Sequence, residues 1–352
     1  MTESSSGPHT RRPRYKGTHP RAFHEKYKEH DPDRYADDVA KVLASGKTPA
    51  GMHRSIMVDA ILARLAPQPG EFAVDATFGY GGHAAALLAA VQPGGRLLAL
   101  DVDPIELPKS EARLRSTGID QESLVVRRCN FAGLAGLLAS EGFPLADVLL
   151  ADLGLSSMQI DDPTRGFTFK HAGPLDLRMN QQRGRPAADL LATLDADALG
   201  RLLEHNADQP DAALLAEALV AHRRLAPIAT TTDLAAAVRD AVSGLPRSRS
   251  AAEPADASVR RVFQALRIEV NDEFGALDMF LRRLPDCLAP GGRVAILTFH
   301  SGEDRRVKHA FRAGLDAGMY QSVADEVERA GPDERRSNPR STSAKLRWAI
   351  RR

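Results

Sequence analysis

The stretch that most constrains the fold is residues 74–88, which read VDATFGYGGHAAALL. An apolar run ends in Asp75, three glycines follow closely, and an alanine- and leucine-rich segment begins at once. Glycines between a strand and a helix permit a tight turn and let a ligand approach the backbone, while the helix start offers free N–H groups. Gly79, Gly81 and Ala84 also satisfy the pattern G-x-G-x-x-A, so the stretch predicts either a nucleotide-type site or only a tight turn.

Strands and helices alternate on both sides of this turn. Short apolar runs predict strands at residues 71–76, 96–103, 122–131 and 146–154, and a further strand follows a turn within residues 290–305. Such alternation is typical of a parallel, doubly wound sheet, which binds ligands at the carboxyl ends of its strands. From residue 162 to 254 only helical segments are predicted. We interpret that stretch as an all-helical domain inserted into an α/β protein.

Charge and cysteine content narrow the class of protein. The net charge is +1 at pH 7, but residues 1–50 are expected to form a basic, partly disordered extension and basic residues recur at the far end. Basic ends suit a polyanionic partner or a solvated tail equally. Cys129 and Cys287 lack a metal-type spacing and predict reduced thiols, so we expect no metal site. No apolar run is long enough to span a membrane and no secretory pattern is present, so we expect a cytoplasmic protein.

Asp101 ends the second predicted strand, where a parallel sheet presents an acid to a ribose. A carboxylate there accepts both hydroxyls of an adenosine ribose and disfavours a 2′-phosphate. This fits nicotinamide adenine dinucleotide (NAD) and S-adenosylmethionine equally. Phe131 follows the third strand, where its ring either lies beside an adenine or belongs to the ordinary core.

The fourth strand separates these two cofactors. Asp152, Ser156 and Gln159 follow its end, and Phe167 and Phe169 continue the same dense polar loop. A dehydrogenase would use this region for a nicotinamide and a hydride acceptor. Groups that accept an amine's hydrogen bonds, with rings to stack on, suit a nucleobase beside a sulfonium methyl. A structured loop that anchors the insertion is the alternative.

Seven blocks of the chain resemble one protein family in the order in which they occur. They are GMHRSIMVDAIL, VDATFGYGGHAAALL, LALDVDP, LLADLGLSSMQIDDPTRGFTFKHAGPLDLRM, FQALRIEVN, PGGRVAILTFHSGEDRRVK and NPRSTSAKLR. Together they resemble the bacterial 16S ribosomal RNA cytosine-N4 methyltransferase family. The likeness runs from about His53 to Arg352 and is broken mainly in the helical insertion.

The resemblance implies an S-adenosylmethionine-dependent enzyme that methylates the exocyclic N4 of a cytidine in the decoding centre of 16S ribosomal RNA, in the small ribosomal subunit. It implies a Rossmann-like class I methyltransferase sheet over residues 51–163 and 255–352, with an insertion at residues 164–254 that is expected to recognise RNA. By position in the matching blocks, the cofactor contacts fall on Gly81, Gly82, His83, Asp101, Phe131, Asp152 and Gln159.

Methyl transfer from a sulfonium is an in-line displacement, so catalysis consists mainly of placing donor and acceptor. Asp152 is our first candidate for holding the N4 amino group. His300, after the later strand, is the second, although a lone histidine is more often structural. A flipped cytidine would stack on a ring while arginines hold its phosphates. The residues expected to bind RNA are Arg165, Phe167, Phe169, Arg178, Arg261 and Arg267.

Three departures from the family pattern bear on function. The block that usually reads FGEERxAxxIAxxI is here NADQPDAALLAEAL, Gly302 stands where a leucine is expected, and shorter members lack the basic extension. The first leaves the RNA contact of the insertion open, and the second should affect packing rather than chemistry. Two other functions stay open, a non-catalytic RNA-binding ribosome assembly factor and an NAD-dependent oxidoreductase. The sequence does not fix the oligomeric state and is compatible with a homodimer.

Overall fold

The computed structural model describes residues 55–245 and 253–352. The extension expected at residues 1–50 lies outside these ranges, so its partial disorder stays a prediction. Arg54–Arg352 form one compact unit. No helix in the described ranges has the length and apolar character that a membrane crossing requires.

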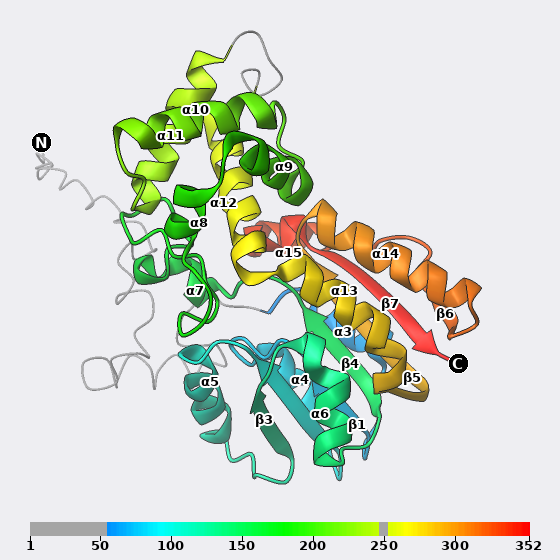
Figure 1. Cartoon of the computed structure of the whole chain (residues 1–352). Helices are drawn as coiled ribbons and strands as arrows, with labels where there is room; N and C mark the ends of the chain where they lie inside the picture. Colours follow the sequence, from blue (N-terminus) through cyan, green and yellow to red (C-terminus); the bar gives the residue numbers. More distant parts are fainter. Residues whose placement is uncertain (1–54, 246–252) are drawn as a thin grey trace, which may run out of the picture. The chain divides into compact units, whose positions relative to one another are not determined.

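A seven-stranded sheet runs through this unit in the order β3-β2-β1-β4-β5-β7-β6 (Figure 1). The first five in this order are parallel, and β7 is antiparallel to both β5 and β6. The strands are β1 (Phe72–Asp75), β2 (Arg96–Asp101), β3 (Leu124–Arg128), β4 (Ala146–Asp152), β5 (Leu288–Thr298), β6 (Tyr320–Val323) and β7 (Lys345–Arg351). The predicted α/β class and its five parallel strands are confirmed, whereas β6 and β7 were not predicted.

The sheet brings three distant carboxylates to one edge. Asp75, Asp101 and Asp152 are the last residues of β1, β2 and β4. Because β1 pairs in parallel with both β2 and β4, these three ends lie side by side. The strand interiors before them are apolar and buried, as expected for strands covered on both faces.

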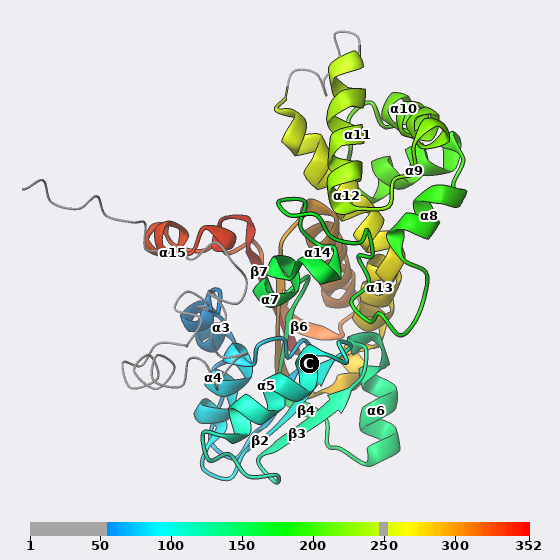
Figure 2. The same cartoon turned by 90° about the vertical axis from the view of Figure 1, so that its left-hand side faces the viewer.

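Helices cover both faces of the sheet (Figure 2). One face packs against α3 (Val58–Leu65), α4 (Gly82–Val91) and α5 (Glu106–Arg115). The other packs against α6 (Leu134–Glu141), α13 (Glu273–Arg283) and α14 (Ser301–Asp316). Shorter elements occupy the connections: η2 (Phe131–Gly133), α7 (Ser157–Asp161), η3 (Pro163–Arg165), η5 (Leu284–Cys287), α15 (Pro332–Ser337) and η6 (Pro339–Ser343).

The segment between β4 and β5 is helical, as predicted, and has a core of its own. Its helices are α8 (Ala187–Thr193), α9 (Ala196–Ala207), α10 (Ala212–Leu225), α11 (Thr231–Gly244) and α12 (Ala255–Asn271). Their apolar faces form one buried cluster, to which α12 contributes Val259, Val262 and Leu266. The packing of the insertion therefore continues past residue 254, where the sequence suggested its boundary, and the domain limits stay a proposal.

Two helical segments that the sequence presented as continuous are divided in the structure. α8 and α9 separate at Asp195, whose side chain caps the N–H of Ala198. α12 and α13 separate at Asp272, which has a left-handed φ of 49°. Neither break contains a glycine or a proline, so the periodic pattern alone did not reveal them.

Candidate cofactor and catalytic site

The turn between β1 and α4 requires its glycines. Gly81 has a φ of 84°, and a Cβ added there would lie 3.2 Å from the ring of Phe78. A Cβ on Gly82 would lie 2.0 Å from Oγ of Ser55. At the start of α4, Gly81 and Gly82 carry no side chain, and neighbouring residues leave little room for a Cβ at either position. The geometry is compatible with the cofactor contact expected at Gly81 and Gly82, which stays a proposal.

Asp101 supports this turn from the end of β2. One carboxylate oxygen accepts the N–H of Gly79 at 2.8 Å and the other accepts the N–H of Asp103 at 2.9 Å. An ionised carboxylate has about four lone-pair sites, so capacity remains for the two hydroxyls of a ribose. Burial raises the pKa of Asp101. The structure places Asp101 beside the glycine turn, as the sequence required for a ribose contact.

His83 lies among the carboxylates at the edge of the sheet. Its Nε2 is 3.4 Å from Oδ2 of Asp152. Asp75 faces His83 from the end of β1 and also interacts with Asp101 and Asp152. We call Asp75, Asp101 and Asp152 the carboxylate cluster. Three buried polar atoms at this place have no hydrogen-bond partner in the described part of the chain, namely Oδ2 of Asp75, Nε2 of His83 and Oδ1 of Asp152.

The pKa values of this group follow from its burial and its charges. Burial raises the pKa of Asp75 to about 6, and the charges of Asp152 and Asp101 act in the same direction. Burial opposes protonation of His83, but Asp152 and Asp75 outweigh it, so the pKa of His83 is raised. The cluster therefore holds an excess of negative charge that a positively charged ligand would relieve.

This charge distinguishes the two cofactors that the sequence left open. The pyrophosphate of NAD is anionic and would lie against the glycine turn, beside carboxylates that repel it. S-adenosylmethionine carries a positive sulfonium and a positive ammonium group, and the ammonium group supplies N–H donors for unpartnered oxygens such as Oδ2 of Asp75. The residues present fit S-adenosylmethionine and disfavour NAD.

Gln159 and Arg165 belong to a buried junction that the sequence did not indicate. Asp103 is fully buried, and its Oδ2 accepts from Gln159 Nε2 at 2.7 Å and from Arg165 Nη1 at 2.8 Å. Arg165 also donates to the carbonyl of Met179 at 2.7 Å. Gln159 completes a capping box with Ser156 at the start of α7. Arg165 therefore ties the loop after β4 to the end of β2, and its 3% exposed side chain is out of reach of an RNA phosphate.

Phe131 begins η2, three positions after the last residue of β3. Its ring meets the ring of Phe280 edge-on, with the centroids 5.3 Å apart. It is half-buried, and β3 pairs with β2 as far as Asp101. Phe131 therefore belongs to the core on one side and stands next to the ribose-binding strand on the other, so both readings of the sequence fit its place.

His300 lies at the start of α14, just beyond the end of β5. Its Nδ1 accepts the N–H of Glu303 at 3.4 Å, and its Nε2 lies 3.2 Å from a carboxylate oxygen of the same residue. Glu303 in turn accepts the N–H of Phe299 at 2.8 Å. Burial would raise the pKa of Glu303, but His300 and Arg267 lower it. Both nitrogens of His300 face Glu303, which favours a positioning role over proton transfer to a substrate.

Arg267 links the helical insertion to this corner. It donates to both carboxylate oxygens of Glu273, at 2.7 and 2.9 Å. Ligand atoms of Glu273, His300 and Glu303 also lie within 4.8 Å of one another, a grouping with the composition of a metal site. A cation bound there would have to displace the guanidinium of Arg267, so the grouping is better explained as an ion-pair network.

The other residues expected to bind RNA make contacts within the protein itself. Phe167 is 9% exposed and packs in the core of the insertion. Phe169 packs against the same core, its ring 5.4 Å from that of Phe263. Arg178 pairs with Asp176 at 2.8 Å, and Arg261 pairs with Glu253 at 2.7 Å. The structure does not gather these side chains with the carboxylate cluster, and their RNA contacts stay a proposal.

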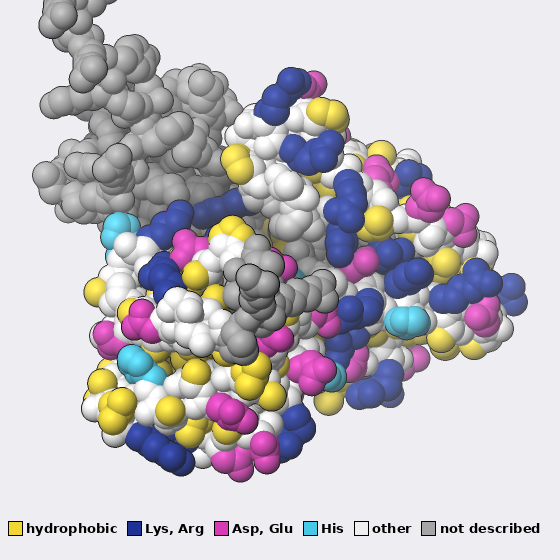
Figure 3. All heavy atoms as spheres, turned by 90° about the horizontal axis from the view of Figure 1, so that it is seen from above, with side chains coloured by type: hydrophobic (Ala, Val, Ile, Leu, Met, Phe, Trp, Pro, Cys, Tyr) yellow, Lys and Arg dark blue, Asp and Glu magenta, His cyan; other side chains and the backbone are white. Residues whose placement is uncertain are grey.

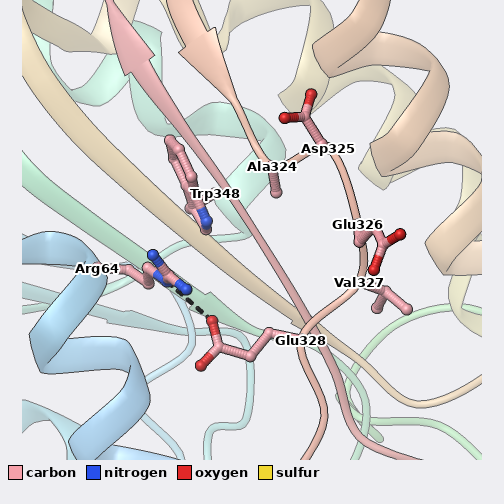
Figure 4. A pocket seen from close by; sticks show the side chains of 7 residues that line it. All are labelled: Arg64, Ala324, Asp325, Glu326, Val327, Glu328 and Trp348. Atoms are coloured by element: carbon pink, nitrogen blue, oxygen red, sulfur yellow. Dashed lines mark hydrogen bonds and ion pairs between the residues drawn. The ribbon is translucent and has the colours of Figure 1, made fainter.

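A separate pocket lies at the far end of the sheet, beside β6 and β7 (Figure 4). Trp348 forms one wall, and Arg64 reaches across it to Glu328 at 2.8 Å. The segment after β6, with Asp325 and Glu326, forms the other wall. This pocket is distinct from the carboxylate cluster, which stands at the ends of β1, β2 and β4.

Sequence reasoning missed two residues of the site, Asp75 and Asp103. Both were visible as acids at the ends of predicted strands, directly before the glycine turn and two residues after Asp101. Their importance depends on partners far away in the chain, since Gln159 is 56 positions from Asp103. An acid at the end of each of two adjacent parallel strands was the signal that could have identified them.

Comparisons with known proteins point in one direction. The model of the MraW methylase family matches residues 50–352. Ribosomal RNA small subunit methyltransferase H 2 of Alkaliphilus metalliredigens is 49% identical over 342 residues, which cover 97% of this chain and 97% of that protein. Ribosomal RNA small subunit methyltransferase H 1 of Lachnoclostridium phytofermentans is 47% identical over 351 residues, which cover 99% of this chain and 95% of that protein.

Solved structures are more distant. The structure of a SAM-dependent methyltransferase from Aquifex aeolicus matches 94% of this chain and 98% of its own, with 10% sequence identity and a TM-score of 0.37. A likeness of this degree carries no conclusion about substrate.

Proposed function

This chain belongs to the MraW methylase family, and from that membership we propose that it methylates the exocyclic N4 of a cytidine in the decoding centre of 16S ribosomal RNA. It is an S-adenosylmethionine-dependent methyltransferase with the α/β sheet of that class. Its relatives named as rRNA small subunit methyltransferases support rRNA as the substrate. The observation that carries the proposal is the carboxylate cluster around the glycine turn, with Asp152 at its open side.

The residues of the turn and of the strand ends would hold the cofactor. The backbone at Gly81 and Gly82 would meet its methionine part, and Asp101 would accept hydrogen bonds from the ribose. Phe131 would lie beside the adenine. When bound, S-adenosylmethionine supplies a methyl group on a positively charged sulfur. The unpartnered oxygens of Asp75 and Asp152 and the ring of His83 would face its charged end.

Asp152 is the residue best placed to act on the acceptor. Its side chain is 27% exposed, more than that of His83, and its Oδ1 has no hydrogen-bond partner among the described residues. The backbone of Asp152 is fixed by Thr77, whose hydroxyl accepts its N–H at 2.6 Å. The lone pair of cytosine N4 is delocalised into the ring, so an acceptor that holds the amino hydrogens as the nitrogen turns pyramidal favours attack. Accurate placement supplies about 7–11 kcal/mol of such a barrier.

No strong base is required in this scheme. Once N4 carries the new methyl group it is cationic and loses its extra proton readily to water or to a nearby carboxylate. This agrees with the position of His300, whose Nδ1 accepts the N–H of Glu303 and whose Nε2 lies 3.2 Å from the carboxylate of Glu303. The target base must leave its stack to reach Asp152, at a cost of roughly a few kcal/mol.

The decisive experiment is mass mapping of methylated nucleosides in ribosomal RNA from cells with and without this protein. We expect one N4-methylated cytidine of 16S RNA to disappear in its absence. It should return with the wild-type gene and with Asp197→Ala, a change at an exposed position of α9, but not with Asp152→Ala. A modification pattern that does not depend on the protein would contradict the proposal. Rescue of growth or assembly by Asp152→Ala without methylation would indicate an assembly factor instead.

A further inference from the structure

A cationic face of α14 was not among the residues expected to bind RNA. Ser301, Arg305, Lys308 and Arg312 follow one another at intervals of four, three and four residues, so they share one face of the helix. All four are exposed, while the opposite face of α14 is buried. Viewed from above, Lys and Arg side chains gather on the right-hand side of the molecule, where α14 lies (Figure 3).

This face begins at the edge of the sheet where the chemistry takes place. β5 pairs with β4 as far as the register of Leu297 with Asp152, and α14 starts at Ser301, four positions beyond Leu297. The helix then runs for 16 residues away from that edge. A chain of phosphates that follows this face would therefore lead toward the position of Asp152.

The charges of the face are only lightly neutralised. Lys308 forms no ion pair with any residue in the ranges 55–245 and 253–352. Arg312 lies 3.3 Å from Asp316, and their side chains are 66% and 61% exposed. Ion pairs as exposed as this contribute little to stability and exchange readily with other anions. The arginines expected from the sequence to bind RNA are less exposed, such as Arg178 at 18% against 53% for Arg305.

Asp208 occupies the end of this face nearest to the site. It is the C-cap of α9 in the insertion, with a left-handed φ of 47°. Its carboxylate accepts the hydroxyl of Ser301 at 3.0 Å and Nη2 of Arg305 at 3.0 and 3.1 Å. A serine hydroxyl and a guanidinium on one anion are also donors with which proteins hold a phosphate. Asp208 therefore stands where a phosphate would bind.

We propose that the α14 face formed by Ser301, Arg305, Lys308 and Arg312 binds the sugar–phosphate backbone of the substrate RNA, and that Asp208 competes with a phosphate for Arg305. The inference rests on the proposed function in taking the partner to be RNA and in taking Asp152 to mark the reacting end of the site. Binding of RNA to Arg305 requires the contact between Arg305 and Asp208 to break. RNA binding on α14 would therefore release α9 of the insertion from the start of α14. Without RNA the same contact holds α9 against the start of α14.

The test compares two pairs of charge reversals that change the net charge equally. Arg305→Glu/Lys308→Glu alters the proposed face, and Arg282→Glu/Arg283→Glu alters exposed residues at the end of α13, which leads through η5 into the start of β5, away from the catalytic edge. Binding of a fluorescein-labelled 16S RNA fragment is followed by anisotropy over a range of salt concentrations. We expect the α14 pair to lose tenfold or more in affinity, on the order of two lost phosphate contacts. Its log–log salt slope should fall by about 1.4, at roughly 0.7 for each contact with a single strand.

A third variant examines Asp208 itself. Asp208→Asn keeps the shape of the side chain but removes the competing charge, so RNA should bind more tightly than to the wild type. All variants are compared for thermal unfolding and for S-adenosylmethionine affinity by calorimetry. The affinity should match the wild type, and thermal unfolding should change little, because the Arg305–Asp208 pair is exposed and such pairs contribute little to stability. Equal RNA affinities for the two reversed pairs would overturn the proposal, as would weaker RNA binding by Asp208→Asn.

A competition with polyglutamate identifies the kind of partner. If the α14 pair loses binding of polyglutamate but keeps that of RNA, the face serves an acidic protein and the RNA proposal is overturned. These measurements do not depend on methyl transfer. A failure of the α14 face is therefore distinguishable from a failure of the proposed function, which the nucleoside map reports.

Discussion

Among single residues, Asp75 is an acid that is removed from water and incompletely hydrogen-bonded by the residues that the structure describes. It is fully buried, its Oδ2 is unpartnered within the described part of the chain, and two further carboxylates face it. A buried acid of this kind destabilises the protein when it ionises, because charge is removed from water without full compensation. Proteins keep such groups mainly where a ligand uses them. Asp75 is thus better explained by the site than by the fold.

Asp75→Asn should separate the effect of Asp75 on stability from its effect on ligand binding. Burial raises the pKa of Asp75 from 3.8 to about 6, so the wild type loses stability as pH rises through that interval. The variant lacks this loss, and its advantage in unfolding free energy should grow by roughly 2 kcal/mol from pH 4 to pH 7. Urea denaturation at several pH values measures it.

Calorimetry on the same variant should show weaker S-adenosylmethionine binding, because one attractive charge is gone. Asp197→Asn, at an exposed position, serves as the control and should change neither quantity. A difference in stability that does not vary with pH would remove Asp75 from the ionised cluster.

The burial of Phe167 changes the effect expected from its substitution, from reduced turnover to reduced stability. The sequence favoured a ring that stacks on a base, and the structure places that ring in the core of the insertion. Phe167→Ala should therefore cost about 3–5 kcal/mol of unfolding free energy, the range for truncation of a buried phenylalanine. Phe167→Leu should cost less. Chemical denaturation of both variants checks this, and a stable Phe167→Ala protein with reduced turnover would restore the stacking role.

At the scale of elements, the start of α14 packs closely against α13 at Gly302. A Cβ on Gly302 would lie 2.6 Å from Cζ of Phe274 and 3.3 Å from Nδ1 of His300. The ring of Phe274 is 7% exposed and has Arg306 over its face, 3.6 Å from the centroid. Phe274 thus fills the space into which a leucine at position 302 would extend. The departure from the family pattern at Gly302 is matched by this packing.

A double-mutant cycle tests that fit. Gly302→Leu alone should destabilise the protein by about 1–3 kcal/mol through overpacking. Phe274→Ala alone should also destabilise it by leaving a cavity. In combination the leucine would fill the cavity, so the double variant should be more stable than the sum of the single changes predicts, by about 1 kcal/mol or more. Strict additivity in urea denaturation would show that the two side chains do not share one space.

At the scale of the whole molecule, the sequence predicted the parallel part of the sheet because each strand is a short apolar run between turn residues. It did not predict β7, in which Lys345, Arg347 and Arg351 interrupt the apolar pattern. Arg347 is nevertheless 5% exposed, because Asp304 accepts its Nε at 2.6 Å. A charged residue that is buried by a distant partner cannot be recognised from local pattern.

The same limit explains the outcome for the site. Glycines and strand ends are local signals, and they placed Gly81, Gly82, Asp101 and Asp152 together. Arg165 depends on Asp103, 62 positions away, so its charge suggested an exposed residue although the side chain is buried. The positions of glycines and strand-end acids were predictable from local sequence. Whether a charged side chain pairs within the protein or remains exposed for a ligand required the structure.

The basic extension can be tested only in the complete protein. Affinity for a 16S RNA fragment should fall as salt rises, because bound phosphates release counterions. A protein that lacks residues 1–50, which lie outside the described ranges, should show a smaller log–log slope if those residues contact RNA. Anisotropy titrations of both proteins give the slopes. Identical slopes would confine the RNA contacts to the remainder of the chain.

The carboxylate cluster also bears on how a catalytic cycle ends. A methyl donor bound here would carry a positive sulfonium and its product a neutral thioether, so Asp75, Asp101 and Asp152 would face one fewer positive charge after transfer. The attraction that favours entry of the donor therefore weakens at the moment of reaction. A cluster of carboxylates would therefore hold the product less strongly than the donor, which favours product release before the next round.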